Sequence, residues 1–318
     1  MQRRTLGSQG LAVSEVGYGS MGINMFYGSS DHDEGVRAIQ RAHDLGVTLF
    51  DTAELYGWGE NEKLVGRAIK DFRDEVVVAT KFGFTRDFGR DSRPDHVREV
   101  VENSLHNLDV DVIDVVYQHR LDPSVPIEDV AGTLKELIDE GKVKHYGLCE
   151  VGPRTIERAH AVHPVSVVQT EYSLFAREVE TIFPTLDELG IGFVPYSPLA
   201  RGFLVGSPRP AAEHEEDDAR RNLPWWQPEN FEHNRAIVER LATIAQEKDA
   251  TVPQLALAWL LTRGEHVVPI PGSRSPQRVE QNVAAATLDL TADDLAAIDA
   301  ALGDGPQGAS TAEAASWE

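Results

Sequence analysis

The sequence predicts an α/β fold: a single (β/α)8 TIM barrel with a short N-terminal hairpin and extra loop and helix segments. Short apolar, β-branched runs alternate with longer amphipathic stretches along most of the 318 residues. The runs are continuously apolar, which is typical of parallel strands buried on both faces beneath outer helices. Eight such units can be counted, and no low-complexity linker divides the chain. We therefore expect one domain over residues 1–318, with a doubly wound open sheet as the second interpretation.

The first strand is expected in the glycine-rich segment 17–22. The other expected strands are 48–51, 76–81, 113–119, 143–150, 165–169, 192–196 and 267–269. The expected helices are 33–45, 60–71, 94–108, 127–139, 154–160, 179–189 and 231–248. Signals at the helix ends support these bounds: Asp33 and Ser92 at N-cap positions, Pro94 near a first turn, and Gly46, Gly141 and Gly190 just past helix ends, where a positive φ is needed.

Three segments fall outside this repeat. The stretch before Ser14 is expected to form a hairpin over the barrel floor. Residues 206–230 are rich in charge, proline and tryptophan, too polar for core and too long for a plain loop, so we expect a functional loop. Residues 303–318 are small and polar and contain no Lys or Arg, so a mobile tail is expected; the alternative is that they reach over the pocket with Trp317.

Composition excludes several classes of protein. No run approaches the roughly 20 apolar residues of a membrane span, and the N-terminus lacks the apolar stretch of a secretory signal. With 30 Lys and Arg against 52 Asp and Glu, the formal net charge is −22, which repels phosphate backbones and anionic lipids, so neither nucleic acid nor membrane is an expected partner. A single cysteine, Cys149, permits no internal disulfide and fits a reducing compartment, the cytoplasm.

The segment Gly17–Gly22 matches G-x-G-x-x-G, the dinucleotide-binding fingerprint of Rossmann folds. That fingerprint requires a helix to open at the third glycine. Here a loop follows over 23–28, and the next helix is expected only near Asp33. The simpler interpretation is a first strand whose glycines allow another group to approach its backbone closely.

Polar residues follow three successive apolar runs. Asp51 and Tyr56 follow one, Lys81 ends the next, and His119 ends the third. The carboxyl ends of barrel strands meet on one face, where active sites form. Taken singly, the aspartate could be a cap and the histidine a hydrogen-bonded core residue. Lys81 is harder to explain structurally, because it is one of only seven lysines and a buried lysine needs a carboxylate partner.

These four residue types suit carbonyl reduction. A free tyrosine has a pKa of about 10 and is a poor acid at neutral pH. A nearby ammonium stabilises the phenolate and lowers that pKa. Asp51 would hold Lys81 charged, and His119 could hydrogen-bond a substrate oxygen. The expected result is a phenol that protonates a developing alkoxide, provided that a hydride donor binds alongside.

The motifs around these residues resemble those of the aldo-keto reductase superfamily from about Leu6 to Leu302. The matching segments are 50–57 (FDTAELYG), 79–83 (ATKFG), 118–119 (QH), 169–174 (QTEYSL), 196–199 (YSPL) and 269–274 (PIPGSR). The resemblance implies a (β/α)8 barrel, reversible reduction of an aldehyde or ketone, and a catalytic tetrad of Asp51, Tyr56, Lys81 and His119 with Tyr56 as general acid.

The same resemblance implies where NADP(H) would bind. Tyr196 would stack on the nicotinamide and Gln169 would hold its carboxamide, whereas Cys149 and Glu150 replace a frequent Ser-Asn pair. Ser273, Arg274 and Arg278 would grip the adenosine 2′-phosphate at the start of the last barrel helix, which favours NADP(H) over NAD(H). The full set of implied cofactor contacts is Gly19, Ser20, Met21, Cys149, Glu150, Gln169, Tyr196, Ser197, Leu199, Arg201, Gly272, Ser273, Arg274, Arg278, Gln281 and Asn282.

The substrate pocket is less well defined by the sequence. The candidates are aromatic residues beside the tetrad segments and in the long polar loop: Tyr27, Trp58, Phe82, Trp225 and Trp226. Each could instead be packing. His160 and His163 have helical spacing but no third ligand nearby, so no metal site is expected.

Two classes of function remain open. The first is an NADPH-dependent reductase of small carbonyl compounds. The second is a regulatory subunit that keeps the barrel and the cofactor but has little turnover. An intact tetrad is compatible with both. A metal-dependent barrel hydrolase would need paired histidines on an early strand, which the sequence lacks.

Overall fold

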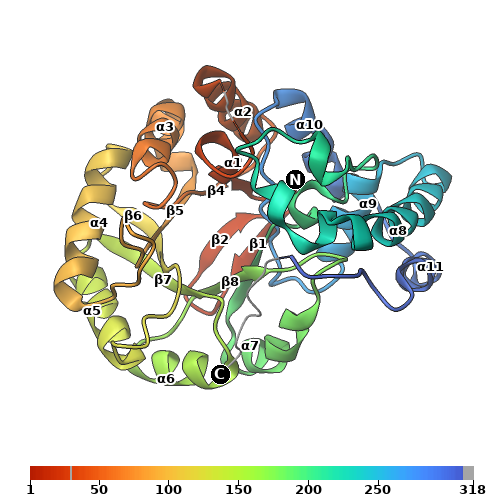
Figure 1. Ribbon diagram of the computed structural model, residues 1–318. Coiled ribbons are helices and arrows are strands. Elements are labelled where there is room, and N and C mark those ends of the chain that lie inside the picture. The colour runs from red at the N-terminus through yellow and green to blue at the C-terminus, as the bar shows by residue number, and fades with distance from the viewer. Residues whose placement is uncertain (29–30, 311–318) are drawn as a thin grey trace.

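The computed structural model describes residues 1–28 and 31–310, and within them seven parallel strands form one sheet in the order β3-β4-β5-β6-β7-β8-β9. Helices surround the strands in a ring (Figure 1). The strands of this sheet are β3 Tyr18–Gly19, β4 Leu49–Asp51, β5 Val77–Phe82, β6 Ile113–Gln118, β7 Val143–Cys149, β8 Val167–Glu171 and β9 Gly192–Tyr196. The predicted barrel architecture is thereby confirmed.

The helices of this described part are α1 Met21–Asn24, α2 His32–Asp44, α3 Glu60–Ile69, α4 Pro94–Leu108, α5 Ile127–Asp139, α6 Pro153–Val162, α7 Phe183–Leu189, α8 Pro228–Glu247, α9 Val252–Leu261, α10 Pro276–Ala284 and α11 Ala292–Leu302. The predicted bounds of α4 and α5 are confirmed residue for residue. The predicted loop after Gly22 is wrong in its first residues, because the single turn α1 runs from Met21 to Asn24; α2 follows from His32.

The eighth barrel position is held by an extended segment, 266–270, joined to β9 by a parallel bridge at Val267. Val268 and Ile270 donate backbone hydrogen bonds to Phe193 and Pro195, of 2.9 and 3.1 Å. On its other side Gly17 N–H donates to Pro269 O, 2.9 Å. Pro269 and Pro271 have no N–H to donate, which explains why the ladder here is too sparse to form a full strand.

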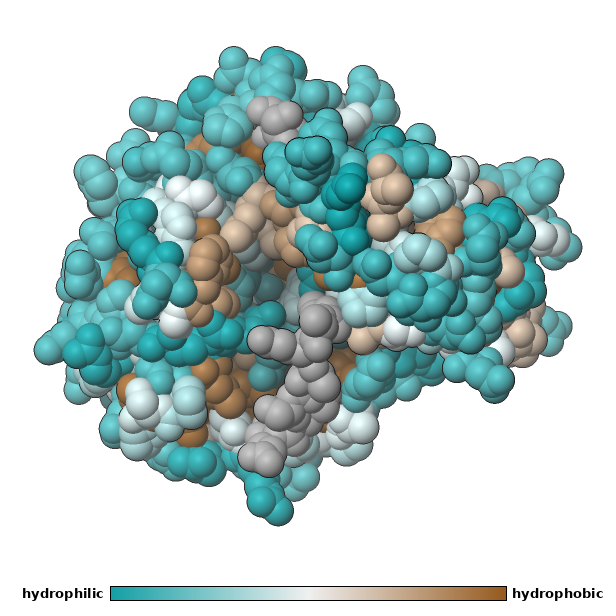
Figure 2. Space-filling view, viewed as in Figure 1, coloured by the Kyte–Doolittle hydropathy of each residue, from teal (hydrophilic) through white to brown (hydrophobic). Residues whose placement is uncertain are grey.

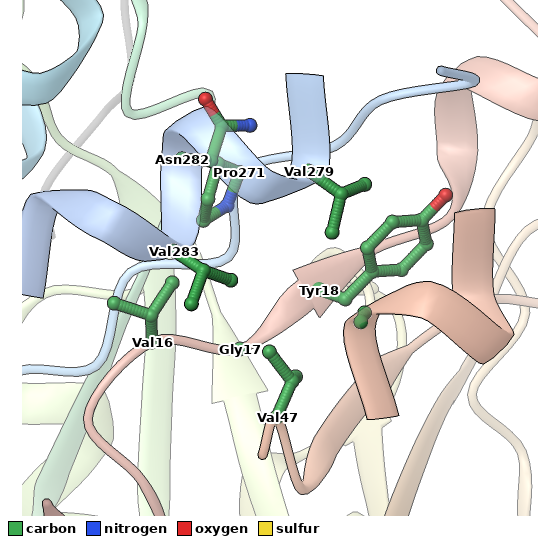
Figure 3. Close-up of a pocket in the computed structure, with 9 residues that line it drawn as sticks. Val16, Gly17, Tyr18, Val47, Pro271, Val279, Asn282 and Val283 are labelled. Atoms are coloured by element: carbon green, nitrogen blue, oxygen red, sulfur yellow. The ribbon is translucent and has the colours of Figure 1, made fainter. Parts of the chain in front are cut away.

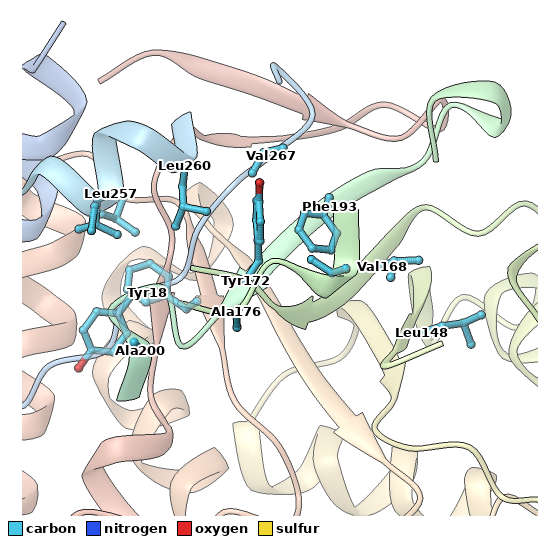
Figure 4. Close-up of a cluster of buried hydrophobic side chains, with 14 of the residues drawn as sticks. Tyr18, Leu148, Val168, Tyr172, Ala176, Phe193, Ala200, Leu257, Leu260 and Val267 are labelled. Atoms are coloured by element: carbon cyan, nitrogen blue, oxygen red, sulfur yellow. The ribbon is translucent and has the colours of Figure 1, made fainter. Parts of the chain in front are cut away.

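Alternate residues of each barrel strand enter two different clusters. Val115 and Tyr117 of β6 pack inside the barrel, while Val116 between them packs against the outer helices. This two-sided burial explains the continuously apolar runs in the sequence. In the outer cluster Figure 4 shows Tyr172 standing between Leu260 and Phe193. The Tyr172 hydroxyl donates to Glu180 Oε1 at 2.7 Å, so this large ring is buried without an unsatisfied polar group.

The N-terminal hairpin is confirmed as the barrel floor. Strands β1 Arg3–Leu6 and β2 Leu11–Ser14 pair antiparallel. Leu6, Leu11 and Val13 belong to the same inner cluster as Leu49 and Val167. The hairpin therefore closes the end of the barrel opposite to the carboxyl ends of the strands.

Two predicted helix caps are wrong by one or two residues. The side chain of Asp31, not Asp33, accepts from the first amides of α2, at Asp33 N and Glu34 N. Arg93 is the N-cap of α4, and the side chain of Ser92 is engaged elsewhere: its Oγ accepts from Gln118 Nε2 at 2.9 Å. The predicted glycines after helix ends are confirmed, with φ of 91° at Gly46, 77° at Gly141 and 61° at Gly190.

The segment 206–230 contains short 3₁₀ turns at Ala211–Glu213, Ala219–Asn222 and Pro224–Trp226. The expectation that it is too polar for core is wrong at its end, because Leu223, Trp225 and Trp226 join the hydrophobic core. Trp226 packs edge-to-face on Phe203, with ring centroids 4.9 Å apart. The polar first half lies at the carboxyl face of the barrel, where the site is described below.

Residues 303–310 contact α8 and the end of β8. Gln307 N–H donates to Asn234 Oδ1 at 2.7 Å, and Ser310 Oγ donates to Glu171 Oε2 at 2.8 Å. The rest of the segment predicted to be a mobile tail, with Trp317, lies outside the described residues, and its mobility stays a prediction.

The carboxyl face of the barrel, viewed in Figure 2, is largely hydrophilic, with hydrophobic side chains gathered around a central hollow. Among the described residues, no helix has the length and apolarity needed to cross a bilayer.

We expect Gly192→Ala to destabilise the protein by about 1–3 kcal/mol, because an added methyl overpacks the floor of the barrel. Its Cβ would lie 2.6 Å from Leu6 Cβ and 2.8 Å from Leu6 Cα. Urea unfolding followed by circular dichroism measures the change. The matched control is Gly132→Ala in α5, whose Cβ would meet nothing within 4 Å and which should be neutral or stabilising by about 0.5–1 kcal/mol. Equal effects of the two variants would contradict the hairpin's role as a packed floor.

Candidate active site

Three of the four predicted catalytic residues form one hydrogen-bonded group at the carboxyl ends of β4 and β5. The Lys81 Nζ atom donates to Asp51 Oδ1 at 2.5 Å, to Thr52 O at 2.8 Å and to the Tyr56 hydroxyl at 3.3 Å. All three protons of the ammonium are thereby used. The opposite carboxylate oxygen, Asp51 Oδ2, accepts from Gln169 Nε2 at 2.8 Å.

Burial removes the water that would otherwise stabilise the charges of this group. Lys81 is 1% exposed and Asp51 is 3% exposed, so neither charge is tolerable without the other. Burial alone would lower the pKa of Lys81, but the charges of Asp51 and Tyr56 outweigh it and raise that pKa above its ordinary value. Lys81 is therefore an ammonium throughout the physiological range.

The predicted lowering of the Tyr56 pKa is wrong, because this pKa is raised. Burial raises the pKa of this phenol above its ordinary value, and the positive charge of Lys81 offsets the rise only in part. Tyr56 is 7% exposed. The phenol is therefore held protonated, with a cation placed to stabilise the phenolate once the proton has left.

His119 completes the group from the end of β6. Its ring meets that of Tyr56 edge-to-face, with centroids 5.9 Å apart, and that of Phe84 with centroids 5.0 Å apart. Burial, followed by the charge of Lys81 and then those of Arg120 and Arg90, lowers the pKa of His119 well below its ordinary value. The imidazole is therefore neutral at neutral pH and keeps one N–H to donate.

A cavity of about 880 Å³ opens beside this group. Its lining runs from Asp51 and Tyr56 to Arg278 and Asn282 on α10. Five arginines face it, against two carboxylates, Asp51 and Glu34; the arginines are Arg201, Arg209, Arg220, Arg274 and Arg278. The cavity of this acidic protein is thus suited to an elongated anion.

Most residues predicted to contact the cofactor line this one cavity. They are Gly19, Met21, Tyr196, Ser197, Leu199, Arg201, Gly272, Ser273, Arg274, Arg278, Gln281 and Asn282. Four others do not. Ser20 is buried against Asp51 O, Gln169 is bonded to Asp51, Cys149 lies in the inner cluster, and Glu150 Oε1 accepts from Glu171 N at 3.0 Å. Burial raises the pKa of the Cys149 thiol to about 12.

The backbone after β9 is strained where it borders the cavity. Ser197, Ala200 and Arg201 have φ of 48°, 49° and 52°, a region that non-glycine residues seldom occupy. The turn is stabilised by a buried ion pair in which Arg201 Nη2 donates to Glu171 Oε2 at 2.8 Å. Such strain is often found at ligand sites.

The other end of the cavity is formed by the start of α10. Figure 3 shows why this helix is fixed there: Val279 and Val283 face Tyr18 and Val16 of the first strand region, while the Asn282 amide points away. The crevice between them, about 10 Å³, holds at most one water. Ser275, the N-cap of α10, makes no side-chain cap hydrogen bond.

The predicted pocket aromatics separate into three groups. Tyr27 and Trp226 line the cavity. Phe82 and Trp225 lie in the outer hydrophobic core and, unlike Trp226, do not line the cavity, which corrects the prediction for these two residues. Trp58 packs on Phe88, with ring centroids 6.1 Å apart, and does not line this cavity, so its role stays a prediction.

The sequence analysis did not predict the contacts that join Tyr27 to Asp218 and Arg274 beside the cavity, which we call the strap. Tyr27 and Asp218 form an antiparallel bridge, and Arg274 Nη2 donates to Tyr27 O at 3.0 Å. This strap brings His214 to the cavity, where its Nδ1 atom lies 3.7 Å from Asp218 Oδ2. The length and polarity of segment 206–230 indicated a functional loop, but nothing in its composition singled out His214 or Asp218.

Comparisons with known proteins identify the family of this chain. A sequence profile described as the Aldo/keto reductase family matches residues 15–302. A probable aldo-keto reductase 1 of Glycine max is 45% identical over 298 residues, which cover 91% of this chain and 86% of that protein. The chain therefore belongs to the aldo/keto reductase family.

Solved structures of relatives superpose over nearly the whole chain. A glycerol dehydrogenase from Gluconobacter oxydans matches with a TM-score of 0.87 and 29% identity, covering 99% of this chain and 98% of that one. An aldo-keto reductase from Klebsiella pneumoniae in complex with NADPH matches with a TM-score of 0.76 and 26% identity, covering 96% of this chain and 97% of that one.

We expect Lys81→Met to destabilise the protein by about 3–5 kcal/mol, because Asp51 is left as an unpaired buried charge. The double variant Asp51→Asn/Lys81→Met should recover much of this loss. Burial raises the folded-state pKa of an unpaired Asp51 above its unfolded value, so the loss should grow as pH rises through the folded pKa. Urea unfolding at about pH 5 and about pH 8 measures it. A loss that is independent of pH would contradict this account of the pair.

Proposed function

We propose that this protein is an NADPH-dependent reductase that converts an aldehyde or ketone to an alcohol, reversibly, with Asp51, Tyr56, Lys81 and His119 as its catalytic residues. The observation that supports this most directly is the Lys81 ammonium held by Asp51 and bonded to the Tyr56 hydroxyl at the mouth of the cavity. Membership of the aldo/keto reductase family supports the reaction class.

The cavity fits the cofactor. It is long enough to border both the catalytic group and α10, and its surplus of arginines matches the negative charge of a dinucleotide phosphate. At its α10 end, Arg274 and Arg278 would hold the 2′-phosphate together with the uncapped amides of the helix. Tyr196 would stack on the nicotinamide, and Gln281 and Asn282 would contact the adenine. A relative from Klebsiella pneumoniae crystallised with NADPH supports this assignment.

Bound NADPH supplies the hydride that reaches the carbonyl carbon. Tyr56 then delivers its hydroxyl proton to the carbonyl oxygen, which gives the alcohol. Lys81 stabilises the phenolate that remains, and its charge is fixed by Asp51. Neutral His119 donates its N–H to the same oxygen and orients the carbonyl toward Tyr56.

The alternative, a regulatory subunit with little turnover, predicts cofactor binding without catalysis. Continuous NADPH oxidation with a generic aldehyde separates the two. Binding of NADPH with no oxidation of it across a broad panel of aldehydes and ketones would favour the subunit.

Tyr56→Phe should lower kcat/KM for aldehyde reduction by about 10²–10⁴-fold, because the general acid is removed. The decrease in NADPH absorbance measures the rate, and tryptophan fluorescence should show NADPH still binding. The matched control is Tyr146→Phe, which removes a buried hydroxyl that donates to His163 O at 2.7 Å, away from the cavity. The control should lose about 1 kcal/mol of stability and little activity. Full activity in Tyr56→Phe would exclude the proposed acid.

Arg278→Gln and Arg274→Gln should each raise KM for NADPH by about 10-fold, through loss of a charge-assisted hydrogen bond to phosphate. KM for NADH should change far less. The control is Arg41→Gln: Arg41 lies on α2, its Nε atom donates to Glu280 at 2.9 Å, and it does not line the cavity. A wild-type preference for NADH would show that the phosphate assignment is wrong.

A further inference from the structure

Arg120, at the mouth of the barrel, has no role in the proposed mechanism. It directly follows His119, and its side chain is half-buried. Its Nη1 atom donates to His119 O at 2.7 Å, and its Nη2 atom donates to the Tyr196 hydroxyl at 3.4 Å. Tyr196 lines the cavity together with Tyr56. The guanidinium therefore contacts both the proposed carbonyl-orienting histidine and Tyr196, a residue of the cavity lining next to which Arg120 lies.

No carboxylate in residues 1–28 and 31–310 forms an ion pair with Arg120. The nearby carboxylates have other partners. Asp51 is bonded to Lys81, Glu171 is bonded to Arg201, and Glu150, whose charge also acts on Arg120, accepts from the Glu171 amide. Within these residues Arg120 thus has no direct ion pair, although neighbouring groups that include Glu150 outweigh its burial and raise its pKa above the ordinary value.

Other cations besides Arg120 also lie near His119. Arg90 lies over the Phe84 ring, 4.1 Å from its centroid, and that ring contacts His119. Lys81, Arg120 and Arg90 all shift the pKa of His119 in the downward direction. Asp51 balances the charge of Lys81, whereas Arg120 has no direct ion pair among the described residues, so its charge can attract an anionic small molecule.

We propose that the preferred substrates of this protein are carbonyl compounds that carry a carboxylate, and that Arg120 binds that carboxylate while the carbonyl lies at Tyr56 and His119. The inference rests on the proposed reductase function and adds a substrate class to it. A planar guanidinium matches a carboxylate through two parallel hydrogen bonds, which a lysine cannot reproduce. Arg120 would be a specificity-determining residue.

The test compares two aldehydes that differ in charge and by one methyl group: 4-carboxybenzaldehyde and its neutral methyl ester, methyl 4-formylbenzoate. Succinic semialdehyde and its methyl ester form a second, flexible pair. For the wild-type protein with NADPH, we expect kcat/KM for the acid to exceed that for the ester by about 10- to 100-fold, mainly through KM, as for a charge-assisted hydrogen bond.

Three variants assign the preference to a residue. Arg120→Gln should bring the acid-to-ester ratio close to one, and Arg120→Lys should keep an intermediate ratio because the charge remains. Arg98→Gln removes the same charge from α4, where Arg98 Nη1 donates to Glu140 at 2.7 Å, and should keep the wild-type ratio. Binding of NADPH by tryptophan fluorescence shows which variants are folded; if Arg120→Gln fails to bind it, the ratio in Arg120→Lys decides.

The outcomes separate the two proposals. A wild-type protein that reduces the ester as well as the acid overturns this inference and leaves the reductase function intact. A high ratio that persists in Arg120→Gln overturns the assignment to Arg120. No reduction of any aldehyde overturns the proposed function and this inference with it. Binding of benzoate but not benzamide to the NADPH-bound protein, lost in Arg120→Gln, would support the inference independently of turnover.

Discussion

The site depends on one buried ion pair, Lys81 with Asp51. The two residues lie on neighbouring strands whose register pairs Asp51 with Ala79. Lys81 lies two residues beyond Ala79 and so points to the same side of the strand, toward Asp51. A slip of one residue would turn Lys81 to the outer face, among the apolar side chains beneath the helices. The register, and everything that holds it, is thus also a condition for the chemistry.

Burial and charge act against each other around this pair, and their balance sets the state of each neighbour. Tyr56 is held as a phenol because burial outweighs the nearby ammonium, and His119 is held neutral because burial and the cations act together. Both groups can therefore donate a proton or a hydrogen bond in the neutral range. The arginine-lined cavity contrasts with the excess of carboxylates that gives the chain its net charge of −22.

The parts of the fold with a repeating pattern could be predicted from the sequence. The strands and helices α4 and α5 follow from apolar runs and end signals. Helix α9 was not predicted because it is apolar on nearly all sides, with Leu255 through Leu260 all buried, so it lacks the amphipathic period of a surface helix. Asp51, Tyr56 and Lys81 could be placed together because strand ends converge in a barrel. Arg120 and His214 could not, because their settings depend on contacts with Tyr196 and with the strap, which no local pattern encodes.

The seam between the first strand and segment 266–271 is sparsely hydrogen-bonded, since Pro269 and Pro271 have no N–H to donate. It closes instead by close backbone contact: a Cβ on Gly19 would lie 2.9 Å from Ile270 O, and one on Gly272 would lie 2.6 Å from Gly19 O. Gly19, Ile270 and Gly272 also border the cavity. A molecule bound there touches both margins of the join, so its binding energy adds to the cohesion of the barrel. Occupancy of the cavity and the integrity of the closed sheet are therefore thermodynamically linked.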